Sequence, residues 1–297
     1  MFILFIALLA PFFSSCSSII ECNLSNHIFR HPATMIFYIS LMNCVFMPLL
    51  LFFGVPTLPS WQALPFYFIL GLIDVIYLYP FYLAMKVIDT SIVTALLSLG
   101  QITIPVMTFF LLDERLTFSQ YSGFVIIIIF SVFLSINNLK LPKLNVAFYY
   151  MVLVSLLRAF YLVLEKYTLK TDGNWINLII YVNVISSLLP FLLLLHKESA
   201  DRIKSVFGEY RKKIKLFCTN EFLCFLSTAA FVFALSKLSA VSSAAINATA
   251  PIFLLLISLS LKKEFNINVR EIITPKIMIK KLVCFSFIIL GVVMVAL

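Results

Sequence analysis

Charged side chains are scarce in this sequence of 297 residues: aspartate, glutamate, lysine and arginine together make up 12%. Ordinary soluble domains carry about 25% charged and roughly 45–50% apolar residues, whereas this chain is 62% hydrophobic. One core cannot hide so much apolar surface from water, so a soluble globular protein is excluded. The sequence predicts an integral multi-pass protein of the cell membrane, with the lipid bilayer as its first partner.

Groups that carry catalysis or hold cofactors are equally scarce. The three histidines have no acidic partner at metal-ligand spacing, and the six cysteines form no CxxC pair. The seven glycines form no phosphate-binding loop, which argues against ATP-driven transport by this chain alone. We therefore expect no enzyme activity, no cofactor and no metal. The net charge of +9 resides in loops flanking apolar segments, which favours anionic headgroups and not nucleic acid as partners.

Long apolar runs are what the sequence does contain, and each is about the length of a bilayer-spanning helix. The runs are too long for barrel strands and do not alternate apolar with polar residues. The first run could instead be a cleaved signal peptide, but no Lys or Arg precedes it, so we expect it to remain as a helix. The sequence thus predicts an all-α protein with ten transmembrane helices at 2–20, 34–54, 63–85, 91–112, 119–137, 146–168, 176–196, 217–237, 242–261 and 278–297.

The second half of the chain repeats the first. A shift of 150 residues places Ala84-Met85 on Ala234-Leu235 and Glu114 on Glu264, and a shift of 144 places Ile20-Glu21 on Leu164-Glu165. These matches predict two five-helix units, at 1–137 and 146–297. An odd number of helices per unit inverts the second unit in the membrane, an arrangement common in secondary transporters with a site near the midplane.

Short motifs in both halves resemble a known family. The segment 111–117 (LLDERLT) followed by Gly123, and the segment 234–240 (ALSKLSA) followed by Pro251, are similar to the EamA-type branch of the drug/metabolite transporter superfamily. The resemblance covers nearly the whole chain. It implies ten helices around a central cavity and transport of small solutes.

Two charges fall inside predicted spans. Asp74 lies at the centre of the third span and Arg158 near the centre of the sixth. A charge at the bilayer midplane costs about 2.5–3.5 kcal/mol on insertion scales, so each side chain is expected to face a partner or water. One interpretation is a substrate or proton site in the cavity, and the other is a mutual ion pair that fixes the two halves.

Six further residues are candidates for the cavity, each with a structural alternative. Glu21 and Glu165 end their predicted spans, where they would either gate a cavity mouth or remain solvated at the interface. Glu221 lies near the start of the eighth span. It would either line the cavity or cap the helix, where the helix dipole stabilises a carboxylate. Gln101 and Asn247 bring amide groups into the fourth and ninth spans, which otherwise pack through small residues. Tyr77, near Asp74, could supply an aromatic wall of the cavity or be an ordinary interfacial tyrosine.

These patterns predict a carrier that moves a small polar or amphipathic metabolite by alternating access, coupled to protons or to exchange. An uncoupled channel-like facilitator and a non-transporting membrane scaffold remain the alternatives. Seventeen lysines and arginines follow the odd-numbered spans and four lie on the opposite side, which predicts that both termini are outside the cell. The family resemblance implies the reverse, with both termini in the cytoplasm.

Overall fold

The protein is described by a computed structural model over residues 2–27, 29, 31–86, 96–97, 100, 103–113, 115–135, 146–250, 252–254, 256–257, 260 and 275–296. Every secondary-structure element in this part of the chain is a helix. In chain order they are α1 (Phe2–His27), α2 (Pro32–Asn43), η1 (Met47–Phe52), α3 (Leu64–Ile76), α4 (Leu78–Met85), α6 (Ile104–Leu112), α7 (Phe118–Ser135), α8 (Val146–Asp172), α9 (Trp175–Leu188), η4 (Leu189–Leu195), α10 (Lys197–Ser205), α11 (Phe207–Lys237), α12 (Ala240–Asn247) and α14 (Pro275–Ala296).

Six helical segments are long and apolar enough to cross a membrane, and three further apolar helices among the described residues are shorter. Large apolar side chains cover much of the outside of the protein, and some polar side chains are buried. Phenylalanine and leucine side chains such as Phe68, Phe110 and Leu153 face outward, while Glu165 and Asn220 are buried. Apolar side chains on the outside and polar ones inside suit a lipid solvent. The multi-pass membrane protein predicted from composition is therefore supported.

The ends of several helices differ from the predicted spans. α11 begins at Phe207, ten residues before the predicted start, and α1 and α8 continue to His27 and Asp172. The predicted loop after residue 196 contains α10. Hydropathy marks where a helix leaves the lipid, but a helix continues through polar residues as long as its backbone hydrogen bonds are made. The third predicted span consists of α3 and α4, which meet at Tyr77.

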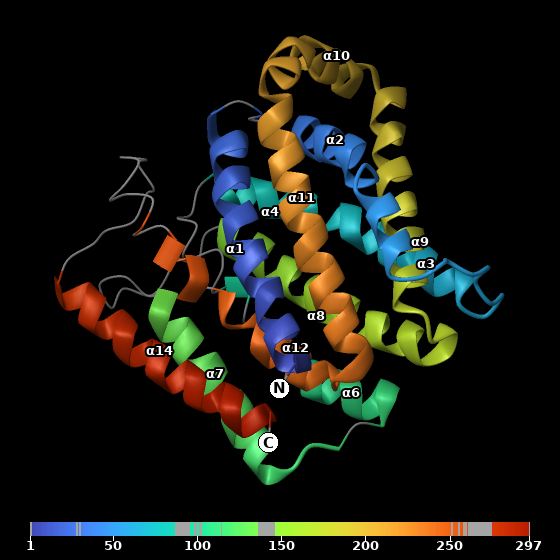
Figure 1. Ribbon diagram of the computed structural model, residues 1–297. Coiled ribbons are helices and arrows are strands. Elements are labelled where there is room, and N and C mark those ends of the chain that lie inside the picture. Colours follow the sequence, from blue (N-terminus) through green and yellow to red (C-terminus); the bar gives the residue numbers. More distant parts are fainter. Residues whose placement is uncertain are drawn as a thin grey trace.

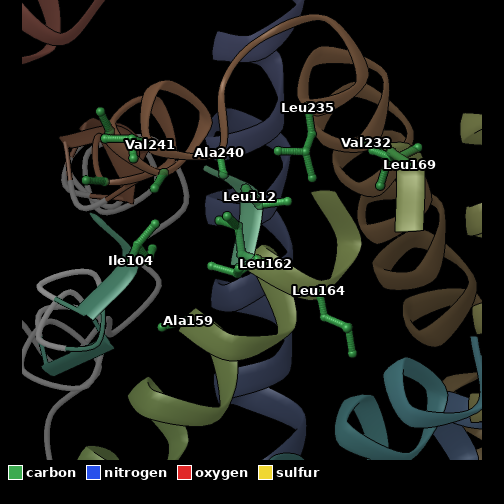
Figure 2. Close-up of a cluster of buried hydrophobic side chains, with 14 of the residues drawn as sticks. Ile104, Leu112, Ala159, Leu162, Leu164, Leu169, Val232, Leu235, Ala240 and Val241 are labelled. Atoms are coloured by element: carbon green, nitrogen blue, oxygen red, sulfur yellow. The ribbon is translucent and has the colours of Figure 1, made fainter. Parts of the chain in front are cut away.

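The helices form a bundle in which α1 lies along α11 and α7 along α14 (Figure 1). The chain ends marked in Figure 1 lie away from α10, at the opposite end of the bundle. α3 packs on α9, and α4 and α6 pack on α8. The larger apolar core joins several of these helices. Figure 2 shows Leu162 of α8 among Ile104 and Leu112 of α6, with Leu235 of α11 and Val241 of α12 around them.

Glycines allow α7 and α14 to approach closely. A Cβ atom added at Gly123 would lie 2.6 Å from the Cβ of Met294 and 2.7 Å from the carbonyl oxygen of Gly291. We expect Gly123→Ala to separate the two helices and to lower the free energy of unfolding by about 1–3 kcal/mol, because backbone atoms cannot yield as a flexible side chain can. Thermal unfolding of the purified protein in detergent measures the change.

The matched control is Gly208→Ala in the first turn of α11, where an added Cβ meets no atom within 4 Å. Here the substitution should stabilise by about 0.4–1 kcal/mol, since alanine restricts the unfolded chain. Equal melting temperatures for the two variants would contradict the close packing of α7 on α14.

Candidate functional site

A polar cavity of about 280 Å³ lies within the bundle. Its walls come from α1, α2, α3, α4, α8, α9, α11 and α12, so helices of both halves of the chain contribute. A second cavity of about 160 Å³ shares several of its residues, among them Glu21, Arg158 and Asn247. The shared residues show that the two spaces are adjacent.

Seven of the eight residues singled out in the sequence line this cavity. α1 contributes Glu21, α3 contributes Asp74, and Tyr77 stands at the junction of α3 and α4. The rest lie on α8, α11 and α12: Arg158, Glu165, Glu221 and Asn247. Gln101, the eighth candidate, lies outside the described residues, as do Glu114, Pro251 and Glu264.

Arg158 lies between two tyrosine rings. Its guanidinium carbon is 5.0 Å from the ring centroid of Tyr77 and 5.5 Å from that of Tyr161, and its Nη1 atom donates to the Tyr77 hydroxyl at 3.4 Å. Such cation–π contacts stabilise a desolvated guanidinium. Asp74 and Glu165 are the carboxylates with which Arg158 interacts electrostatically.

The mutual ion pair of Asp74 and Arg158 is not formed in this structure. The two ion pairs with N–O distances within 4.0 Å among the described residues are Arg202–Glu198 and Lys212–Glu209, on α10 and α11. The tyrosine faces take the place that a carboxylate would occupy beside Arg158. Asp74 and Arg158 therefore lie in one cavity without direct contact.

A second polar cluster joins α1 to α11 on the cavity wall. The amide nitrogen of Asn220 donates to Glu221 at 2.9 Å and to Glu21 at 3.4 Å. Ser17 donates to the amide oxygen of Asn220 at 2.9 Å and also contacts the sulfur of Cys224 at 2.9 Å. One amide thus holds two carboxylates close together inside the bundle.

The solvated interpretation of Glu165 and the helix-dipole interpretation of Glu221 are wrong. Glu165 is 4% exposed and lies inside α8, and Glu221 is 3% exposed and lies well inside α11. Glu21 lies inside α1 and is partly exposed, so both of its interpretations remain open. Glu221 is too far from the start of α11 for the helix dipole to stabilise its carboxylate, because that effect is confined to the first turn. Each predicted span end was the edge of an apolar run, and the helix continues beyond it.

Several residues of the site are not singled out by the sequence patterns. Ser17, Asn220 and Cys224 all fall within predicted apolar spans. A signal was present, since Ser17 lies one turn before Glu21 and Asn220 one turn before Cys224, on the same helix faces. Tyr161 lies one turn after Arg158 in the same way. Such polar pairs at a spacing of three or four residues mark the inward face of a membrane helix.

No group of three or more histidine, cysteine, aspartate and glutamate side chains with metal-site geometry occurs among the described residues. The cavity instead offers carboxylates that can take up protons or cations, and one fixed guanidinium. These groups can bind and orient a polar solute and neutralise its charge away from water. The geometry suits binding of a polar solute and uptake or release of protons.

Comparison with known proteins finds a solved structure with a similar fold. A solved crystal structure, described simply as that of a protein, covers 99% of this chain and 94% of its own, with a TM-score of 0.67 at 13% sequence identity. At that identity the likeness concerns the fold alone. A comparison with curated proteins finds no match.

Apolar helices around a buried polar cavity define an integral multi-pass membrane protein. The model of the EamA-like transporter family, which falls within the drug/metabolite transporter superfamily, matches residues 1–136, a little under half of the chain. Over these residues the family resemblance predicted from the sequence motifs is confirmed.

Proposed function

We propose that the protein is a secondary transporter of the cell membrane, which moves a small polar or amphipathic metabolite by alternating access. The observation that carries the proposal is the charged cavity, because buried ionisable groups in a membrane bundle mark substrate or ion pathways. A scaffold has no need of four carboxylates and an arginine around one internal space. Protons are the proposed coupling ion, with Asp74 as their carrier.

We further propose that residues 1–137 and 146–297 are inverted five-helix units, which together form ten membrane helices. The packing supports this proposal, since α1 contacts α11 and α12 while α8, its equivalent, contacts α4 and α6. The cavity supports it as well. Residues related by the shifts of 144 and 150 line it in pairs from opposite halves: Glu21 and Glu165, Asp74 and Cys224, and Phe81 and Phe231.

Alternating access follows from such a repeat. If each unit can adopt two conformations, exchanging them between the units moves the opening of the cavity from one side of the membrane to the other. The substrate site stays fixed near the middle while the helices on either side rock. The contact of α1 with α11 and that of α4 with α8 are the equivalent surfaces on which the two units would slide.

Asp74→Asn tests the coupling step. Asparagine keeps the shape of the side chain but cannot release a proton, so substrate-driven proton movement should fall to the level of empty liposomes while the protein still inserts. Purified protein in liposomes with trapped pyranine measures the pH change. The solutes applied are phenethylamine, phenylalanine, 3-phenylpropionate and glucose, which span positive, zwitterionic, negative and neutral charge.

Asp201→Asn is the matched control, because Asp201 is an exposed carboxylate of α10 outside the cavity. It should retain the wild-type response. Saturable flux of a solute without proton movement would contradict proton coupling, and non-saturable flux would indicate a channel-like facilitator. Absence of flux for every solute in wild-type liposomes would contradict a transport function for this panel and favour a scaffold.

A further inference from the structure

The acidic residues around the cavity differ in whether a positive charge lies near them. Arg158 interacts electrostatically with Asp74 and Glu165, which leaves that group with one net negative charge when all three are ionised. The leading electrostatic neighbours of Glu221 are Glu21 and Asp74, both acidic, and Arg158 is not a leading neighbour of Glu21 or Glu221. When ionised, the pair Glu21 and Glu221 therefore carries two negative charges that the arginine does not directly compensate.

The glutamate pair is only partly satisfied by the protein. Asn220 donates through a single amide nitrogen to Glu221 at 2.9 Å and to Glu21 at 3.4 Å. Ser17 and Cys224 make longer contacts with Glu21, at 3.5 and 3.8 Å. Two carboxylates offer about eight acceptor positions, so most of them remain open toward the cavity that both residues line.

Tyr82 lies next to the glutamate pair. It is 1% exposed and lines the same cavity, and its hydroxyl lies near Glu21 but makes no hydrogen bond of good geometry. The hydroxyl interacts electrostatically with Glu21 and Glu221. A buried hydroxyl without a hydrogen bond of good geometry is costly, because it loses its hydrogen bonds to water and gains little in return. A ligand between these groups would satisfy it.

We propose that Glu21, Glu221 and Tyr82 form a binding subsite for the ammonium group of the transported solute, which makes this solute a small primary amine. The proposal deepens the transport function and rests on it. An ammonium group has three donors and one positive charge, which match two carboxylates and a hydroxyl oxygen. Neither a carboxylate nor a phosphate would be tolerated beside the two glutamates.

The surrounding side chains define the rest of the solute. Tyr77 and Phe81 line the cavity beside the subsite, with ring centroids 6.4 Å apart, and Phe81 makes an edge contact with Tyr82 at 5.5 Å. Aromatic faces accept apolar groups and also attract a cation. A volume of about 280 Å³ limits the solute to a compact body. An amine with a short apolar or aromatic body fits both features.

Equilibrium binding to the purified protein in detergent tests this subsite without transport. The three probes have the same aromatic body and differ in charge: phenethylamine, 2-phenylethanol and 3-phenylpropionate, each titrated by calorimetry at neutral pH. We expect the amine to bind at least about tenfold more tightly than the alcohol, and the carboxylate to show no binding. Tighter binding of 3-phenylpropionate, or no binding of phenethylamine, would overturn the proposal.

Variants separate the subsite from general damage to the bundle. Glu221→Gln should weaken phenethylamine binding about tenfold or more and leave 2-phenylethanol unchanged, while Asp201→Asn should alter neither. If Glu221→Gln fails to fold, Tyr82→Phe removes the hydroxyl alone and should weaken the amine selectively. An equal loss of affinity for phenethylamine and 2-phenylethanol in these variants would overturn the proposed subsite. Amine binding without flux in liposomes would contradict transport and leave the subsite standing.

Discussion

Lys166→Met is expected to destabilise the protein more than any other single lysine replacement among the described residues. Lys166, on α8, is 9% exposed, and its ammonium group donates to the carbonyl oxygens of Leu235 and Leu238 at 2.7 and 2.6 Å. These carbonyls lie at the end of α11, where a helix leaves its last acceptors unpaired. Each charged hydrogen bond contributes about 1.5–3 kcal/mol to stability. We therefore expect Lys166→Met to lower the free energy of unfolding by about 3 kcal/mol or more.

Two other lysines provide graded controls for this measurement. Lys170, one turn later on α8, donates to a single carbonyl, that of Leu112 at the end of α6, at 2.9 Å. Lys204 is exposed on α10. Thermal unfolding in detergent should therefore give the lowest melting temperature for Lys166→Met, an intermediate one for Lys170→Met and the highest for Lys204→Met. If Lys166→Met and Lys204→Met have the same melting temperature, the buried ammonium does not stabilise the end of α11.

Arg158→Met is expected both to abolish transport and to lower stability. Without the guanidinium, Asp74 and Glu165 lose the positive charge with which they interact. Removing one member of a buried charged group typically costs about 3–5 kcal/mol, because the remaining charge is left uncompensated. Arg158→Lys keeps the charge but not the planar group between Tyr77 and Tyr161, so it should fold better than Arg158→Met and still transport poorly.

A second substitution distinguishes charge from packing at this position. In Arg158→Met combined with Asp74→Asn, one of the stranded carboxylates is gone, and we expect the melting temperature to recover in part. A destabilisation of the double variant that is smaller than the sum of the two single effects measures the coupling between the two sites. No recovery would mean that Arg158 stabilises the bundle through its tyrosine contacts and not through Asp74.

The membrane class and the positions of most helices could be predicted from the sequence. Bilayer thickness fixes the length of a spanning helix, so apolar runs such as 63–85 and 146–168 point directly to α3, α4 and α8. Helix ends could not be predicted in this way. α11 runs through Arg211, Lys212 and Lys213 because a surface helix tolerates charge, and hydropathy cannot distinguish such a helix from a loop.

The charged members of the cavity could also be predicted, since a buried charge in a span has few structural explanations. The arrangement of those residues could not. That Arg158 faces Tyr161 and not Asp74 depends on how α8 is rotated against α3, which the sequence does not determine. The bridging role of Asn220 could not be predicted, because Asn220 donates to two glutamates on different helices that come together only in the folded protein.

The length of α11 has a consequence for the membrane in which the protein works. Its 31 residues extend about 46 Å, whereas the hydrocarbon core of a bilayer is about 30 Å thick. The excess must lean or protrude, and the lean changes with the thickness of the lipid. Because the same helix carries Asn220 and Glu221, we expect bilayer thickness to affect the separation of Glu21 and Glu221. If the two glutamates bind the solute as proposed, lipid chain length should then change its affinity.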